Sequence, residues 1–171
     1  AQNTVQISGR IETIMDCTIV NERIPQSGEE IAAIFLNNGA SIGTITSTSP
    51  EKHTSITGTV RCVGGSIDLI EGEDTLFKLP SIPAKGSEWY NIYVGGNTDH
   101  IGEIGTIAGG RFEEGDCTLF VGTNGRIGTI SGGIFTKTVS EGYYNVYNGG
   151  IIETISGGVF NNSTASYDFG N

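Results

Sequence analysis

The stretch Gly125-Arg-Ile-Gly-Thr-Ile-Ser-Gly-Gly-Ile-Phe135 decides the fold, because it returns twice more in nearly the same form. A later copy reads Ile151-Ile-Glu-Thr-Ile-Ser-Gly-Gly-Val-Phe160, and an earlier one reads Ile104-Gly-Thr-Ile-Ala-Gly-Gly-Arg-Phe112. Degenerate copies of the Ile-x-Thr-Ile core stand at residues 11–14, 42–45 and 67–70. The last isoleucines of the six cores are 23 to 37 residues apart, which is the spacing of a repeat protein.

A short β-prone run precedes each core, at residues 5–7, 34–36, 60–63, 92–94, 118–121 and 145–147. Asparagine and glycine, which accept the backbone conformations of tight turns, stand between each run and its core. Each period therefore reads strand, turn, strand and Gly-Gly corner, followed by a short strand that carries Phe112, Phe135 or Phe160. One period cannot bury its apolar side alone, but stacked periods can. The sequence predicts an all-β fold, a single right-handed parallel β-helix (solenoid) of about six coils with corner loops, spanning 1–171 as one domain.

Other repeat architectures fit less well. A propeller blade needs four strands and about 40 residues, and a leucine-rich repeat needs leucines that this chain lacks. The longer separations predict corner loops at about residues 16–27, 47–56 and 71–88, where the four prolines lie. Ser27 and Glu30 have capping-box spacing, so a single helical turn is the alternative there.

Composition narrows the classes of partner. The chain carries a net charge of −10 at pH 7, the wrong sign for neutralising phosphates, so we expect neither nucleic acid nor a membrane as partner. The start at Ala1-Gln2 has the form of a chain after removal of a signal peptide. Cys17, Cys62 and Cys117 form no CxxC pair and leave the disulfide state open.

The Ile-Gly-Thr-Ile-Ser-Gly-Gly-x-Phe unit, preceded by a Tyr-Asn-x-Tyr or Thr-Leu-Phe strand and an Asn/Gly turn, carries a resemblance. It resembles the Gly-rich parallel β-helix repeats of bacterial surface and secreted proteins, most clearly over residues 90–160. The resemblance implies a secreted or cell-surface location and a structural or adhesive role. It implies no catalytic residues.

Two acidic segments are candidate calcium sites, because a bent loop can bring several carboxylates onto one hard cation. Their side chains are Glu71, Glu73 and Asp74 in one segment, and Glu113, Glu114 and Asp116 in the other. Neither has EF-hand or RTX spacing, and the alternative is that both are solvated loops. We expect no cofactor other than this candidate calcium.

Aromatic residues gather at two equivalent strand positions about 54 residues apart. They are Trp89, Tyr90 and Tyr93 in one group, and Tyr143, Tyr144 and Tyr147 in the other. Such rows can stack on sugar rings, which makes glycans candidate partners, or they can stack on one another.

Catalytic and ice-binding functions have weaker support. The Asp residues are well separated, and His53 and His100 lie in loops without a triad or metal motif. The threonines that share one repeat slot predict a ladder whose hydroxyls pair along the sheet. A flat threonine row could also bind ice, but its neighbouring slots hold Gly, Glu and Ile.

The ends of the solenoid suggest the function. The sequence shows no capping repeat or helix, and an uncapped coil exposes unpaired backbone groups. We therefore expect a non-catalytic extracellular subunit that binds itself end to end in a filament or surface array. The alternatives are a carbohydrate-binding adhesin module and a polysaccharide lyase or hydrolase.

Two local expectations test the repeat register. Ile127, Ile130, Ile152 and Ile155 should be almost fully buried. At least one glycine in each of the pairs 109–110, 132–133 and 157–158 should have a conformation closed to other residues.

Overall fold

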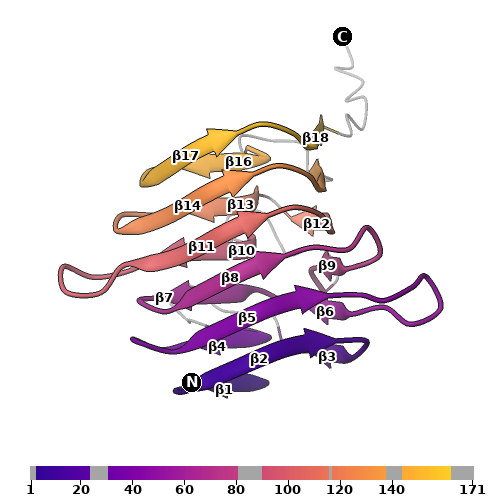
Figure 1. Ribbon diagram of the computed structural model, residues 1–171, viewed down its shortest axis with the longest axis horizontal. Coiled ribbons are helices and arrows are strands. Elements are labelled where there is room, and N and C mark those ends of the chain that lie inside the picture. The colour runs from indigo at the N-terminus through magenta and orange to yellow at the C-terminus, as the bar shows by residue number, and fades with distance from the viewer. Residues whose placement is uncertain (1–2, 24–30, 81–89, 116, 138–143, 163–171) are drawn as a thin grey trace, which may run out of the picture.

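A computed structural model describes residues 3–23, 31–80, 90–115, 117–137 and 144–162, and these form a parallel β-helix of six coils (Figure 1). Each coil contributes one strand to each of three six-stranded parallel sheets. In Figure 1 the front strands run from left to right while the chain climbs from the N-terminus to the C-terminus and returns behind them, which is the right-handed sense. The predicted fold class is confirmed.

The three sheets are named here in the order in which each coil visits them. Sheet A contains β1 (Val5–Ile7), β4 (Ile34–Leu36), β7 (Val60–Val63), β10 (Tyr90–Gly95), β13 (Cys117–Val121) and β16 (Val146–Asn148). Sheet B contains β2 (Arg10–Met15), β5 (Ser41–Thr46), β8 (Ser66–Ile70), β11 (Gly102–Ile107), β14 (Gly125–Ile130) and β17 (Ile151–Ile155). Sheet C contains β3 (Thr18–Val20), β6 (Ser55–Thr57), β9 (Leu76–Lys78), β12 (Arg111–Gly115), β15 (Ile134–Lys137) and β18 (Val159–Asn162).

Both isoleucines of the repeated core face inward. Ile104 and Ile107 are fully buried, whereas Gly105 and Thr106 between them are both partly exposed. Residues three apart cannot share one face of a straight strand, so two consecutive outward residues mark a bend inside the motif. The same slots stack coil on coil, as in Ile104 on Ile127 and Ile107 on Ile130. These ladders form the core of the solenoid.

A ladder of phenylalanines lines the inner face of sheet C. The ring centroids of Phe77, Phe112, Phe135 and Phe160 are 4.7, 4.6 and 4.8 Å apart in order, with interplanar angles of 9°, 3° and 7°. These distances match the roughly 4.8 Å spacing between neighbouring strands. Ile19 and Ile56 continue the same column in the first two coils.

The Gly-Gly corners confirm the prediction made for them. Gly110, Gly133 and Gly158 have φ values of +97°, +95° and +99°, in the region that side chains disfavour. At Gly132, the first glycine of one pair, an added Cβ would collide with the backbone oxygen of Ala108 in the coil below. The second position of the pair thus requires glycine because of its positive φ, and the first requires glycine because there is no room for a side chain.

Two expectations were wrong. The segments predicted as loops at 16–27, 47–56 and 71–88 contain β3, much of β6, and β9. Their inward residues are Ile19, Ile56 and Phe77. The pattern did not reveal these strands because no Gly-Gly pair precedes them. Ile127 and Ile130 are fully buried as expected, but Ile152 is only half-buried and Ile155 is 54% exposed. Both lie in the sixth coil, where no coil of the described chain covers them.

Other expectations are settled only in part. Ser27 and Glu30, of the alternative helical turn, lie outside the described residues. Over the described ranges, no helix is long and apolar enough to cross a membrane. Cys17, Cys62 and Cys117 form no disulfide in the described structure, and burial raises the pKa of Cys62 to about 12.

Candidate functional site

Both ends of the solenoid have open strand edges. Within the described chain, β16, β17 and β18 pair only with the strands of the fifth coil, and β1, β2 and β3 pair only with those of the second. We call the first edge, with Val146, Ile152, Ile155 and Phe160, the C-terminal face. We call the second edge, with Val5, Ile11, Ile14 and Ile19, the N-terminal face. An open edge is a row of backbone donors and acceptors available to another strand.

The C-terminal face exposes side chains that are core residues in every coil below it. Ile155 is 54% and Phe160 is 38% exposed, whereas Ile130 and Phe135 in the same slots of the fifth coil are fully buried. Ile151 and Val159, which point outward at the same edge, are 57% and 50% exposed. Apolar side chains thus gather beside the open edges of β17 and β18.

The N-terminal face differs from the C-terminal face in its exposure. Ile7 and Ile14 remain buried, and Val5, Ile11 and Ile19 are partly buried against the core. These side chains occupy the inward slots of the first coil. They are therefore the first members of the core columns whose last members lie at the C-terminal face.

The aromatic residues form an outward column on sheet A. The ring of Phe120 stacks on Tyr93 at 5.5 Å and 9°, and on Tyr147 at 4.5 Å and 15°. The guanidinium carbon of Arg61, one coil below, lies 4.4 Å from the centroid of the Tyr93 ring. Figure 1 shows this sheet behind sheet B.

The sequence analysis placed Tyr93 and Tyr147 in equivalent slots. It did not identify Phe120, which lies between them in the column, or Arg61, which lies one coil below Tyr93. Aligning residues 118–121 with 92–94 by their hydrophobic alternation would have found Phe120. Tyr90 is buried, its ring 4.5 Å from that of Phe120, and Tyr144 is exposed, 6.3 Å from Tyr147. Trp89 and Tyr143 lie outside the described residues.

Ring faces in this column are turned toward one another rather than toward solvent. A sugar ring stacks on the face of an aromatic ring, and here Tyr93 and Phe120 occupy each other's faces, as do Phe120 and Tyr147. The column therefore presents mainly ring edges along the side of the solenoid. Its last ring, Tyr147, is 41% exposed at the C-terminal face.

The acidic segments lie on two elements. Glu71, Glu73 and Asp74 follow β8, Glu113 and Glu114 belong to β12, and Asp116 lies outside the described residues. Glu113 accepts a hydrogen bond from Arg111 at 2.6 Å. In the part of the chain that the structure describes, no three His, Cys, Asp or Glu side chains are close enough to hold a metal ion.

Charged side chains on sheet B link successive coils. Arg126 in the fifth coil donates to Glu103 in the fourth at 3.3 Å and to Glu153 in the sixth at 2.5 Å. At the other end, Arg10 donates to Glu12 at 2.7 Å and lies 3.7 Å from Asp68, two coils above. Its hydrogen bond lowers the pKa of Glu12. Arg10 and Arg126 belong to one column of sheet B, and the sequence alone did not identify their acidic partners.

The remaining candidates do not converge on a reactive centre. Thr13, Thr44, Thr106, Thr129 and Thr154 share one column on sheet B, as predicted, with Leu69 in the third coil. His53 contacts the carbonyl of Pro50 through Nδ1 at 3.1 Å. His100 receives no ring contact in the described structure, and its backbone N–H donates to Asn97.

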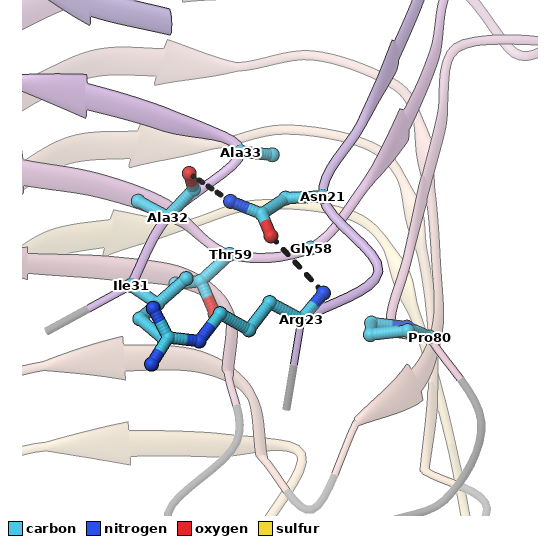
Figure 2. A pocket seen from close by; sticks show the side chains of 8 residues that line it. All are labelled: Asn21, Arg23, Ile31, Ala32, Ala33, Gly58, Thr59 and Pro80. Atoms are coloured by element: carbon cyan, nitrogen blue, oxygen red, sulfur yellow. Dashed lines mark hydrogen bonds between the residues drawn. The ribbon is translucent and has the colours of Figure 1, made fainter. Parts of the chain in front are cut away.

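A small hollow lies at the corner between sheets C and A (Figure 2). Asn21 donates to the carbonyl of Ala32 at 2.9 Å and accepts from the backbone N–H of Arg23 at 3.1 Å. The hollow is half-open, and the space inside it suits about one water molecule.

Comparisons with protein-family models, with curated proteins and with solved structures found no match to this chain.

Proposed function

We propose that this chain is a non-catalytic structural subunit of a bacterial surface or secreted assembly, and that it associates with itself through the ends of the solenoid. One observation carries the proposal: within the described residues, core columns and strand ladders run unbroken through six coils and stop at an exposed edge. Ile155 and Phe160, exposed there, occupy slots that are fully buried one coil below. Covering them with a further coil removes apolar surface from water and pairs the open edges.

The distribution of charge favours the same mode of association. The chain carries a net charge of −10. Acidic side chains such as Glu51, Glu73 and Glu114 are exposed on the sides of the solenoid, so its negatively charged flanks repel one another when solenoids lie side by side. Association through the ends keeps these flanks apart. The extracellular location rests on the resemblance of the repeat to surface and secreted proteins.

The test is the molecular mass of the purified full chain as a function of concentration. Sedimentation velocity should show growing assemblies, and electron microscopy should show rods one solenoid wide. Ile155→Lys places a charge on the C-terminal face and should leave a folded monomer. A matched control is Ile101→Lys, because Ile101 is 59% exposed but lies in the connection between β10 and β11 on the flank.

The control variant should assemble like the unaltered chain. Circular dichroism should show that both variants keep their β-structure. A chain that stays monomeric at every concentration would refute the proposal. Equal loss of assembly in the two variants would show that the contact is not at the C-terminal face.

A further inference from the structure

We infer that the surface docking on the C-terminal face is the N-terminal face of a second copy, in the same polarity and register, so that the assembly is an open head-to-tail rod. This inference rests on the proposed function and goes beyond it by choosing the partner surface. The competing arrangement pairs two C-terminal faces about a two-fold axis and stops at a dimer.

Strand direction separates the two arrangements. Every strand pair inside the solenoid is parallel, as in β14 with β17 and β15 with β18. A first coil placed on the sixth in the same polarity continues all three parallel ladders. A two-fold axis across the end reverses the strands and also reverses the order of the sheets around the solenoid. At least two of the three sheets would then meet a different sheet.

The head-to-tail junction also repeats contacts that the solenoid already uses. Phe160 would lie beneath Ile19 of the second copy, in the same column where Phe77 lies above Ile56. Ile155 would lie beneath Ile14 of the second copy, as Ile130 packs on Ile107. The N-terminal face thus offers side chains of the right size in the slots where the C-terminal face leaves core residues exposed.

The charged side chains on sheet B are compatible with this arrangement. The column Arg10, Ser41, Ser66, Glu103, Arg126, Ile151 ends at the C-terminal face, so the next residue in a head-to-tail rod is Arg10 of the second copy. Glu153 is already bound by Arg126 from below. In this register Glu12 of the second copy would lie directly above Glu153. Each of these two carboxylates already has its own guanidinium partner, Arg10 for Glu12 and Arg126 for Glu153, which offsets the repulsion between them.

Cysteine cross-linking tests the polarity. Thr13 and Thr154 are exposed members of one column at opposite ends of the chain. Within one chain they are five coil spacings apart, about 24 Å at ~4.8 Å per coil. The experiment mixes two full-length proteins, one carrying Thr13→Cys and the other Thr154→Cys, each with Cys17→Ser. A thiol cross-linker of short reach is added and the linked peptides are identified by mass spectrometry.

Head-to-tail docking predicts a link between residues 13 and 154 in the mixture and little cross-linking in either protein alone. A double variant, Thr106→Cys with Thr129→Cys, is the positive control, since these residues are Cα partners in adjacent coils. A 154–154 link in the second protein alone, or association without the 13–154 link, would overturn the polarity and leave the proposed function standing. If light scattering shows no association of the unaltered chain, the proposed function itself is refuted.

A capping experiment gives an independent readout. Ile155→Lys blocks the C-terminal face and leaves the N-terminal face intact, so in a head-to-tail rod it adds to the growing end and terminates it. A tenth of this variant in the mixture should shorten the rods several-fold, while the same amount of Ile101→Lys should not. Tail-to-tail docking predicts that the unaltered chain forms dimers and no rods, and that the Ile155→Lys variant, which then has no surface through which to bind, leaves those dimers unchanged.

Discussion

Replacing Phe112 with alanine should destabilise the folded chain much more than replacing Phe160. Phe112 is fully buried and its ring stacks on Phe77 at 4.7 Å and on Phe135 at 4.6 Å. Removal of such a ring costs about 3–5 kcal/mol through lost burial and the cavity left behind. Each stacked pair contributes roughly 0.5–1.5 kcal/mol beyond the free energy of burying its apolar area. With two such pairs, the loss for Phe112→Ala should lie toward the upper end of that range of about 3–5 kcal/mol.

Phe160 is the matched control, because it has the same side chain in the same column. It is 38% exposed, and among the described residues its ring stacks on that of Phe135 alone, at 4.8 Å. With one ring partner, and open space where a cavity would otherwise form, its replacement should cost about 1–2 kcal/mol. Urea unfolding followed by circular dichroism, at concentrations where the chain is monomeric, measures both values. Equal losses, or a loss below about 1 kcal/mol for Phe112→Ala, would contradict the ladder as the main support of sheet C.

The remaining predictions concern a corner, two thiols and a carboxylate. Gly133→Ala forces a side chain onto a residue with φ of +95° and should lower the free energy of unfolding by about 1–3 kcal/mol, as urea titration will show. Cys62, whose pKa is raised to about 12 because it is buried, should react with a thiol reagent at pH 8 far more slowly than the partly exposed Cys17, and unfolding should equalise the two rates. The pKa of Asp16 is lowered because the hydroxyl and backbone N–H of Thr48 donate to its carboxylate. Its stabilising effect is complete above the unfolded pKa of about 3.9 and is lost as the pH falls through the folded pKa. The stability difference between the unaltered chain and Asp16→Asn should therefore be constant from pH 5 to 7 and shrink below about pH 4.

The sequence predicts the architecture well because stacking makes the fold depend on one short pattern. The Ile-x-x-Ile core appears in all six coils, so sheet B follows from it directly. Sheet C is harder to predict in the early coils, because Thr18–Val20 and Ser55–Thr57 are three-residue strands with a single inward side chain each. Their pairing with neighbouring coils, and not their own sequence pattern, makes them strands.

The candidate surfaces are less predictable from sequence, for two physical reasons. Whether a core slot is buried depends on a coil above it, which is why Ile155 and Ile130 have the same sequence context and opposite exposure. Side chains that bridge coils come from residues 23 to 58 positions apart, as in Arg126 with Glu103 and Arg10 with Asp68. Such partners become visible only when the register between coils is known.

The parallel ladders have a mechanical consequence. The covalent chain runs around the solenoid, whereas the hydrogen bonds between coils run along its axis. A pull along the axis is therefore resisted at each boundary by three rows of hydrogen bonds that share the load, together with the stacked isoleucines and phenylalanines. The weakest boundary is the one below a coil with a neighbour on one side only. Under tension the solenoid should stay stiff and shed whole coils from its ends. In a rod of many copies, the junctions between copies, which no covalent chain crosses, are the further places at which separation could begin.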